Sequence, residues 1–265
     1  MLKINIDASS PPPSPSPSPE AVSQGIDLLF LGNFVHQVVN PMNAVIGTLD
    51  NLHEGIYNAT DTKQKINAAR AQLEQCVTLI KNLAFLSEVS SDTKILPSPS
   101  NKGISVLSQT VIEAAQFFQE TASNKNIAID LNDPSSSQYK IQGRPEALRQ
   151  VFMNLFDNGV KYGLNDSKVI ITSRVSKKTR HLLVEVSNES IGFLNVEAEK
   201  IFELGYRTSE AKKAVLLSTG LGLYICRKIM RDFFGGDIKA EHSNAKGLTT
   251  FTISFKPGTW SNEKI

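Results

Sequence analysis

The sequence has few cysteines and no excess of one charge. Its 265 residues include two cysteines, Cys76 and Cys226, which lie far apart and outside any Cys-x-x-Cys motif. This number and spacing exclude a disulfide framework and a zinc ribbon, and they favour a reducing cytoplasm. The 28 Lys and Arg residues nearly balance the 26 Asp and Glu residues, which gives a net charge of +2. A basic surface of the kind that drives nucleic-acid binding is therefore not expected.

The sequence also lacks a convincing membrane segment. Residues 1–10 contain no apolar stretch of the kind found in a signal peptide. Residues 28–49 carry no formally charged side chain and are long enough to cross a bilayer. Six residues of this segment are unsuited to hydrocarbon, namely Asn33, His36, Gln37, Asn40, Pro41 and Asn43. We therefore expect no transmembrane segment and a cytoplasmic protein.

The remaining composition supports a folded core behind a short tether. Hydrophobic residues make up 40% of the chain and charged residues 20%, which excludes wholesale disorder. At about 100–200 residues per domain, the length predicts one large domain or two smaller ones. Six of the 12 prolines lie in residues 11–20. We interpret residues 1–23 as a disordered tether rich in Pro and Ser, and a ligand for an SH3-like partner is the less favoured interpretation.

Residues 24–90 carry the spacing of two amphipathic helices. Apolar residues recur at steps of three and four, and after a break near Asn58 the same spacing returns in a second helix that Thr60 or Asp61 can cap. The expected seams consist of Leu28, Leu31, Val35, Val38, Met42, Val45, Leu49 and Leu52 in the first helix and of Ile66, Ala69, Leu73, Cys76, Ile80 and Leu83 in the second. Because two helices cannot enclose a core, we expect a hairpin that dimerises into a four-helix bundle.

A second domain of mixed structure follows a linker. We assign residues 91–103 to the linker, residues 104–257 to the domain and residues 258–265 to a C-terminal tail. Periodicity predicts helices at 106–121, 144–162 and 219–234, and strands at 126–132, 168–175, 181–187, 237–242 and 248–255. This mixture predicts an α+β sandwich, with helices packed on one sheet and a long loop containing glycines before the last helix.

A motif in the first helix is the first candidate for chemistry. Residues 34–47 have the sequence FVHQVVNPMNAVIG. His36 directly follows the seam residue Val35, so its imidazole should point out of the bundle on a face that it shares with Asn40. Pro41 cannot donate the helical hydrogen bond at its position and should bend the helix one turn past the histidine. An exposed histidine is by itself more often inert, and the surrounding sequence decides the interpretation.

This motif resembles the H-box of sensor histidine kinases, in which an acid follows the histidine and Asn or Thr precedes a proline. The second domain contains further motifs similar to those of the same family, in the family's order: RQVFMNLFDNGVKYG (149–163) resembles the N-box, VSNESIGF (186–193) the G1 box, IFELGYRTS (201–209) the F-box and STGLGLYICRKI (218–229) the G2 box. The resemblance covers about residues 24–255. It implies a phosphoacceptor hairpin followed by an ATP-binding domain of the type shared with gyrase and Hsp90, the GHKL ATPases.

The resemblance also implies the roles of individual residues. His36 would be the phosphoacceptor, assisted by Gln37 and Asn40, and Asn158 would hold Mg²⁺ against the phosphates of ATP. The implied nucleotide-binding residues are Asn154, Asn158, Lys161, Tyr162, Asn188, Gly192, Arg207, Thr219, Gly220, Leu221, Gly222, Leu223 and Thr249. Gly220 and Gly222 open the last helix, where backbone N–H groups and the helix dipole favour an anion.

Two departures from the family pattern bear on activity. The G1 aspartate, which in the family accepts a hydrogen bond from the adenine amino group, aligns with Asn188, and the glycine two residues later is Ser190. An amide oxygen can still accept this bond, and the lost charge should cost about 1 kcal/mol. The second departure is Gln37, which replaces the acid of the H-box. Glutamine can orient the imidazole but cannot offset its developing positive charge, so we expect a slow kinase.

The resemblance therefore predicts a dimeric, ATP-dependent protein-histidine kinase that passes its phosphoryl group to the aspartate of a response-regulator receiver domain. By the same resemblance, Asn40 would orient water for dephosphorylation of that regulator. Residues 1–23 leave no room for an input domain, so input would come from a separate sensory partner or from the kinase domain itself.

Two other functions remain open at this point. The first is a non-catalytic phosphotransfer or phosphatase hub with a degenerate ATP domain, which the departures at Gln37, Asn188 and Ser190 favour. The second is a dimerisation module that uses ATP binding as a conformational latch, and this function would require no His36. The intact Asn158, Lys161, Gly220 and Gly222 favour the kinase over the hub. The H-box match around His36 disfavours the latch, which would make that match a coincidence.

Overall fold

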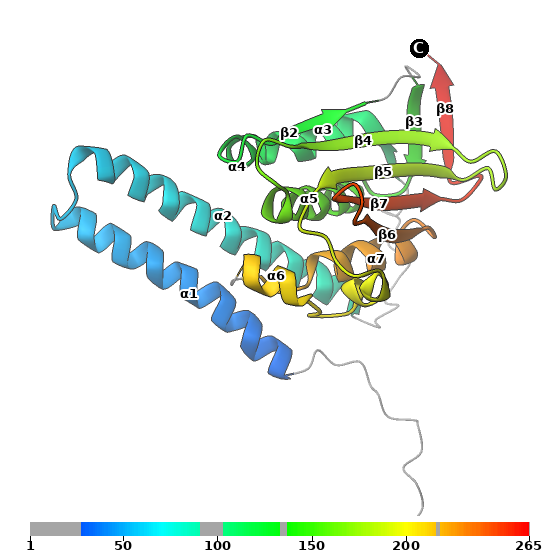
Figure 1. Ribbon diagram of the computed structural model, residues 1–265. Coiled ribbons are helices and arrows are strands. Elements are labelled where there is room, and N and C mark those ends of the chain that lie inside the picture. Colours follow the sequence, from blue (N-terminus) through cyan, green and yellow to red (C-terminus); the bar gives the residue numbers. More distant parts are fainter. Residues whose placement is uncertain (1–27, 91–102, 133–136, 216–217, 265) are drawn as a thin grey trace, which may run out of the picture.

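A helical hairpin forms the first part of the computed structural model, which describes residues 28–90, 103–132, 137–215 and 218–264 (Figure 1). Helix α1 (Leu28–His53) runs through Pro41 without a break, and α2 (Ala59–Ser90) returns alongside it. The cap of α2 is Asn58, and not Thr60 or Asp61 as predicted. Its Oδ1 accepts a hydrogen bond from the backbone N–H of Asp61 at 2.9 Å, while its Nδ2 donates to the Asp61 carboxylate at 2.7 Å. The tether and the linker lie outside the described residues, apart from Gly103.

The seam predicted for α1 divides into two stripes. The stripe that faces α2 contains the buried Phe34, Pro41 and Val45 and the half-buried Val38. A second apolar stripe remains exposed, with the exposed fractions Val35 48%, Val39 41%, Met42 44%, Ile46 53% and Leu49 55%. At 3.6 residues per turn, the two stripes lie about a quarter turn apart around the helix.

Helix α2 repeats this division. Ala69, Cys76 and Leu79 are buried, and the Cys76 thiol lies 3.6 Å from the carbonyl oxygen of Val38 on α1. Four apolar side chains on its other stripe are about half exposed, namely Ile66, Leu73, Val77 and Ile80. Each helix of the hairpin therefore presents one apolar stripe to its partner helix and a second one to solvent.

The second unit is built on a five-stranded sheet with the order β2-β4-β5-β7-β6. The strands are β2 (Ala128–Leu131), β4 (Lys168–Val175), β5 (Leu182–Glu189), β6 (Asp237–Ser243) and β7 (Leu248–Phe255). β2 pairs parallel with β4, and the other pairs are antiparallel. Side chains alternate between a buried and a partly exposed face along β5 and β7, as expected for a sheet covered on one side.

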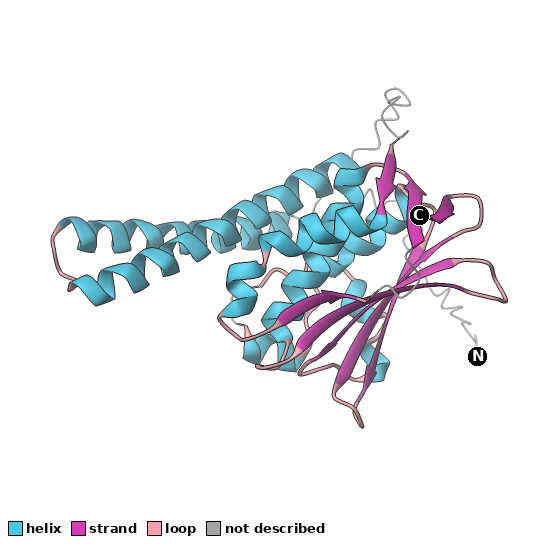
Figure 2. Cartoon of the chain, turned by 90° about the horizontal axis from the view of Figure 1, so that it is seen from above, coloured by secondary structure: helices cyan, strands magenta, loops and turns pink. Residues whose placement is uncertain are grey.

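Helices cover the buried face of this sheet, and its other face is open (Figure 2). They are α3 (Leu107–Phe117), the short α4 (Gln119–Ser123), α5 (Pro145–Tyr162) and α7 (Gly222–Asp232). The core between the layers contains the fully buried Phe152, Phe156, Leu148, Leu155, Ile171, Leu182, Ile225, Ile229, Met230 and Phe255. The predicted sandwich of helices on one sheet is therefore present.

A second, three-stranded sheet differs from the prediction. It has the order β1-β3-β8 and consists of β1 (Ile104–Val106), β3 (Ser137–Gln142) and β8 (Trp260–Lys264). Residues 258–265 were expected to be a tail, yet Trp260–Lys264 pairs with β3 along its length, and the Trp260 ring packs edge-on against Tyr139 at 5.8 Å. The helix predicted from residue 106 begins at Leu107 and breaks after Phe117, before α4.

The hairpin packs on the second unit through α2. In Figure 1, α2 lies between α1 and the sheet unit. Asn82 of α2 is 4% exposed, and its Oδ1 accepts a hydrogen bond from Nε2 of Gln150 on α5 at 2.9 Å. Leu79 is likewise buried at this contact, in the same core cluster as the residues of α5 and α7. The first half of α5 is thus in direct contact with the hairpin. No described helix is long and apolar enough to cross a membrane.

Candidate functional site

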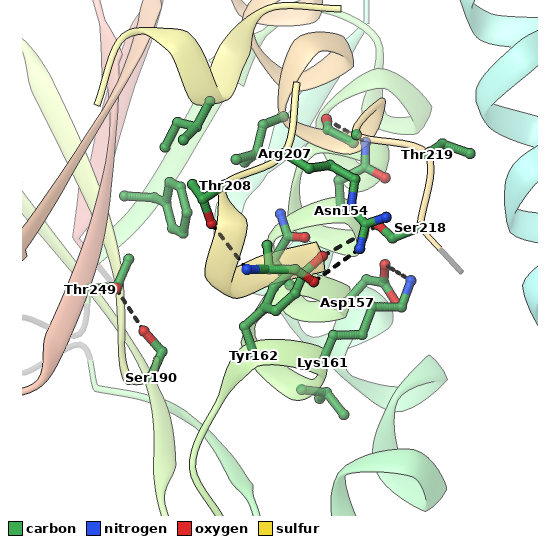
Figure 3. Close-up of a pocket in the computed structure, with 18 of the residues that line it drawn as sticks. Asn154, Asp157, Lys161, Tyr162, Ser190, Arg207, Thr208, Ser218, Thr219 and Thr249 are labelled. Carbon is green, nitrogen blue, oxygen red and sulfur yellow. Dashed lines mark hydrogen bonds and ion pairs between the residues drawn. The ribbon is translucent and has the colours of Figure 1, made fainter. Parts of the chain in front are cut away.

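A cavity of about 280 Å³ lies where α5, the start of α7 and the ends of β5 and β7 meet (Figure 3). The loop after β5 and the segment around Arg207 also line it, as do Phe117, Phe118 and Thr121 from α3, α4 and the junction between them and Leu79 and Asn82 of α2. Its volume lies just below the usual range for small-molecule sites, which is about 300–1,000 Å³. Polar groups from several elements converge on it, which marks it as the candidate site among the described residues.

Helix α5 supplies one polar wall. Its apolar face is buried under the sheet, so Asn154, Asn158 and Lys161 line the cavity from the other side of the helix. Lys161 donates to the Asp157 carboxylate at 2.6 Å, one turn earlier. At the end of the helix, the Tyr162 hydroxyl donates to Oγ of Ser218 at 3.3 Å (Figure 3). The cation of Lys161 is therefore held inside the cavity by a carboxylate on its own helix.

Asn158 has an unsatisfied polar atom. Its Nδ2 is buried and has no hydrogen-bond partner among the described residues, and such an atom usually costs about 1–3 kcal/mol. A bound polyanion would satisfy this donor, while the Oδ1 of the same amide is a suitable ligand for Mg²⁺. The donor set of the cavity therefore fits a nucleotide phosphate with its metal.

The start of α7 forms a second wall. Gly220 adopts φ +67°, and a Cβ there would lie 2.7 Å from the backbone of Gly205 and Tyr206, so the position requires glycine. Asn154 fixes this turn from across the cavity by donating from Nδ2 to the carbonyl oxygen of Gly222 at 3.2 Å. The α7 N-terminus thus opens into the cavity, where its free N–H groups favour an anion.

The end of the sheet forms the third wall. Asn188 on β5 and Thr249 on β7 line the cavity, and His242 on β6 lies behind them as the register partner of Thr249. Thr249 Oγ1 lies 2.7 Å from Oγ of Ser190 and 3.0 Å from Nδ1 of His242 (Figure 3 shows the Ser190 contact). These four side chains are at most 9% exposed. Gly192, at φ +69°, leaves room for the His242 ring, because a Cβ there would lie 2.2 Å from Nε2.

A short helix closes part of the cavity above these walls. Thr208 caps α6 (Ser209–Ala214) by accepting a hydrogen bond from the Ala211 N–H at 3.1 Å. Arg207 donates to the carbonyl oxygens of Ala211 and Val215. Tyr206 lines the same wall and donates to Glu197 at 2.8 Å, and this hydrogen bond raises the pKa of the Tyr206 hydroxyl.

The structure brings together nearly all the nucleotide-binding residues expected from the sequence. The residues that line the cavity are Asn154, Asn158, Lys161, Tyr162, Asn188, Gly192, Arg207, Thr219, Gly220, Gly222, Leu223 and Thr249. Leu221 is the exception, because its side chain is fully buried in the core and does not line the cavity. Its neighbourhood is still polar, since its backbone N–H donates to Oγ1 of Thr219 at 3.2 Å.

The residues expected to act on the phosphoacceptor side lie elsewhere. His36 and Asn40 are exposed on α1 and do not line the cavity. Gln37 belongs to the same helix, but its side chain lies outside what the structure describes. Helical spacing places His36 on the side of α1 that faces away from α2.

Several site residues escaped the sequence analysis. Asp157 could have been found from its i,i+4 spacing to Lys161. His242 gave no signal, because its contact with Thr249 depends on the register of β6 and β7. Asn82 and Gln150 gave none either, because their contact joins helices 68 residues apart in the sequence.

Comparison with known proteins points to one family. Residues 143–259 match the family model described as histidine kinase-, DNA gyrase B-, and HSP90-like ATPase. Sensor histidine kinase WalK of Bacillus subtilis (strain 168) is 26% identical over 229 residues, which are 86% of this chain and 36% of that protein. Sensor protein EvgS of Escherichia coli O157:H7 is 25% identical over 85% of this chain and 18% of that protein. The chain thus spans about a third or less of the length of these two relatives.

A solved structure shares the fold. Histidine kinase AdeS of Acinetobacter baumannii superposes with a TM-score of 0.59 at 19% identity, over 84% of this chain and 98% of that chain. This superposition covers parts of both units described above, so the fold similarity extends beyond the residues that the family model matches.

Proposed function

We propose that this chain is the core of an ATP-dependent protein-histidine kinase. It is a relative of the sensor histidine kinases, and its residues 143–259 match the ATPase domain of the histidine kinase, gyrase B and HSP90 type. His36 would receive the γ-phosphoryl group of ATP and pass it to an aspartate of a response-regulator receiver domain. The observation that carries this proposal is the cavity in which Asn154, Asn158, Lys161 and the α7 N-terminus converge.

The walls of the cavity suggest how ATP would lie. The triphosphate would lie between Lys161 and the N-terminus of α7, where a cation and free N–H groups favour negative charge. The base would reach Asn188, Ser190 and Thr249 at the end of the sheet. Asn158 would hold Mg²⁺, whose charge would offset that of the phosphates in the transition state.

The transfer itself needs a neutral imidazole at position 36. A ring nitrogen of His36 would form the bond to the γ-phosphorus as the bond to the β–γ bridging oxygen breaks, and ADP would leave. The ring would then lose the proton from its other nitrogen. Because positioning dominates phosphoryl transfer, the contribution of this chain would be the placement and charge neutralisation given by Lys161 and the α7 turn.

The placement of His36 sets a condition on this step. His36 is exposed on α1, whereas the cavity abuts Leu79 and Asn82 of α2. The ATP domain must therefore rotate away from its own α2, or it must serve the histidine of a second protomer. Mixing a His36→Gln chain with an Asn158→Ala chain distinguishes transfer within one protomer from transfer between two protomers. In this mixture, label appears only if the ATP domain of one protomer serves His36 of the other.

Dimerisation would cover the exposed stripes of the hairpin. In a four-helix bundle each helix touches two neighbours about a quarter turn apart, which is the angle between the buried stripe and the exposed stripe of α1. Val39, Met42 and Ile46 on α1 and Val77 and Ile80 on α2 would then be buried between two copies. This arrangement supports a homodimer as the working form.

A response regulator as partner is supported by a relative. The structure of histidine kinase ThkA with response regulator protein TrrA superposes with a TM-score of 0.57 at 21% identity, over 86% of this chain and 60% of that chain. By analogy we propose that the hairpin around His36 docks a receiver domain, and that Asn40 orients water when the same surface dephosphorylates it. The signal would come from a separate partner or from parts of a longer protein.

The experiment that tests the kinase is incubation of the purified chain with γ-labelled ATP and Mg²⁺. We expect a label that is labile in acid and stable in base, as a phosphoramidate is, and that moves to an added receiver domain. A label that is stable in acid, or none at any ATP concentration, would contradict the proposal.

The second candidate is the non-catalytic phosphotransfer or phosphatase hub. Asn188 stands where the family has an aspartate, and no other described residue supplies a carboxylate at the sheet end of the cavity. In that case the chain would take a phosphoryl group from a phosphorylated receiver domain but not from ATP. The same purified protein, given both donors in parallel, separates the two functions.

A further inference from the structure

We propose that the cavity accepts 6-oxopurine nucleotides as well as adenine nucleotides. This inference rests on the proposed function, since it requires that the cavity hold a nucleoside triphosphate with its base toward Asn188, Ser190 and Thr249. It concerns which base these side chains select.

Among the described residues, no side chain at the end of the cavity near the sheet can only accept a hydrogen bond. Its buried polar side chains are the amide of Asn188, 4% exposed, and the hydroxyls of Ser190 and Thr249, 9% and 4% exposed. Among the described residues that line the cavity, the acidic one is Asp157, which lies on α5 and is bound to Lys161. Amides and hydroxyls both donate and accept, so this wall imposes no fixed pattern on a base.

The hydroxyls belong to a hydrogen-bond chain that can run in two directions. The chain joins Nδ1 of His242 to Oγ1 of Thr249 at 3.0 Å and Oγ1 of Thr249 to Oγ of Ser190 at 2.7 Å. When Nδ1 accepts, Thr249 donates to it and Ser190 donates to Thr249, so Ser190 presents lone pairs to the cavity. When Nδ1 carries the proton, both hydroxyls turn, and the Ser190 hydrogen is free to point into the cavity.

Asn188 has the same versatility. Its Nδ2 donates one hydrogen to the carbonyl oxygen of Glu189 at 3.2 Å, which leaves a second N–H and the amide oxygen. Either can face a ligand after rotation of the amide. Asn188 and Thr249 are register partners on β5 and β7, so both dual-function groups lie at one level of the sheet.

The two purine types differ in the pattern that such a wall would meet. Adenine donates from its 6-amino group and accepts at N1, whereas a 6-oxopurine accepts at O6 and donates from N1. A carboxylate at position 188 would accept a hydrogen bond from the amino group of adenine. Against a 6-oxopurine it would place one acceptor opposite another, O6, and both buried groups would lack a hydrogen bond. Sites built in that way reject a mismatched analogue strongly, whereas the amide and the reversible hydroxyl chain can match both bases.

The experiment compares the affinities of ATP and ITP for the full chain with Mg²⁺ by calorimetry. ITP differs from ATP only at C6 and the N1 proton. For the wild type we expect dissociation constants within about fivefold of each other, and for Asn188→Asp we expect preference for ATP to rise by about tenfold or more. Asn195→Asp is the matched control, because it places the same charge at an exposed position of the loop after β5, outside the cavity lining.

The outcomes separate the two proposals. Tight ATP binding with ITP weaker by about a hundredfold in the wild type would overturn this inference and leave the kinase standing. Binding of neither nucleotide at millimolar concentration would overturn both. An unchanged preference in a folded Asn188→Asp protein would remove Asn188 from base recognition and with it the inference. If that variant does not fold, the wild-type comparison alone decides the question.

Discussion

Asn158 is the residue of the cavity whose side chain most directly indicates a ligand. Its Nδ2 is buried with no partner in the part of the chain that the structure describes, and the residue lines the cavity between Asn154 and Lys161 on the same helix. A buried amide with an unpaired donor is costly in a free protein, so its position is best explained by a ligand that pairs it.

The first prediction follows from this amide. Replacing Asn158 with Ala removes the oxygen proposed to hold Mg²⁺, so ATP affinity should lose its dependence on Mg²⁺, whereas contacts at the sheet end should keep some nucleotide binding. Calorimetry with Mg²⁺ and with EDTA measures this difference. Asn132→Ala, at an exposed position outside the cavity, is the control and should retain the wild-type Mg²⁺ dependence. Full Mg²⁺ dependence in the Asn158→Ala protein would assign the metal to another residue.

The second prediction concerns Gln37, which follows His36, the proposed phosphoacceptor. Gln37→Glu would place a carboxylate next to His36, where it can accept from one ring nitrogen and offset the charge that forms on the ring. We expect autophosphorylation to become about tenfold faster at saturating ATP, the low side of the general-base range. Nucleotide affinity should not change, because no described side chain of α1 lines the cavity. An equal or slower single-turnover rate would show that another group already fills the role of the acid.

The third prediction uses the thiol of Cys226. The thiol is fully buried 3.6 Å from the carbonyl oxygen of Val151, and burial raises its pKa from 9.0 to about 12. Between these two values the unfolded state loses the thiol proton first. The free energy of unfolding should therefore fall as the pH rises above 9, by up to about 1.4 kcal/mol per pH unit from this group.

Urea unfolding of the wild type and of Cys226→Ser at pH 8, 9 and 10.5 measures this slope. The serine protein should lose less stability over this range, because its hydroxyl does not titrate there. Equal slopes in both proteins would mean that Cys226 does not stay protonated in the folded state.

At the scale of elements, the two stripes of α1 and α2 lead to a fourth prediction. Ile46→Lys places a charge in the centre of the exposed stripe, so the chain should become monomeric at micromolar concentration if the hairpins form a bundle. Ala44→Lys is the matched control, because Ala44 is exposed on the opposite side of α1. Light scattering should show a dimer for the wild type and the control, and a wild-type monomer would contradict the bundle.

The elements also show where sequence reasoning works and where it stops. The α5 helix and the β4 to β7 strands were predicted within a few residues, because each combines strong periodicity with flanking turns. The strand β8 was missed because residues 260–264, WSNEK, have no apolar alternation. That strand is specified by its partner β3, including the packing of Trp260 on Tyr139, which is a long-range contact.

The seams of the hairpin illustrate a subtler limit. Steps of three and four residues select an apolar surface about half a helix wide, and they do not show which part of that surface meets which neighbour. Val38 and Val45 therefore face α2, while Val35 and Met42 of the same predicted seam remain exposed. Only the position of α2 divides the two sets.

At the scale of the whole molecule, the motifs predicted which residues lie together. Their order along the chain matches that of a family with a known fold, and the fold brings them to one site. The residues of the N-box, G1 box and G2 box converge on one cavity, although the outermost of them, Asn154 and Leu223, lie 69 residues apart in the sequence. The docking of α2 was beyond the sequence, since it rests on long-range contacts: the amide pair of Asn82 and Gln150, the ion pair of Arg70 with Glu120 at 3.4 Å and the buried Leu79. Contacts of this kind have no local pattern.

The central claim is that His36 receives the γ-phosphoryl group of ATP. Residues 4–62 contain no Lys or Arg, so tryptic cleavage leaves His36 and His53 on one peptide and cannot separate them. The direct measurement is therefore labelling with γ-labelled ATP of the wild type, His36→Gln and His53→Gln, with ATP affinity determined for each. The account predicts an acid-labile label on the wild type and on His53→Gln, none on His36→Gln, and equal ATP affinity in all three. Acid-labile label on a folded His36→Gln protein would contradict it.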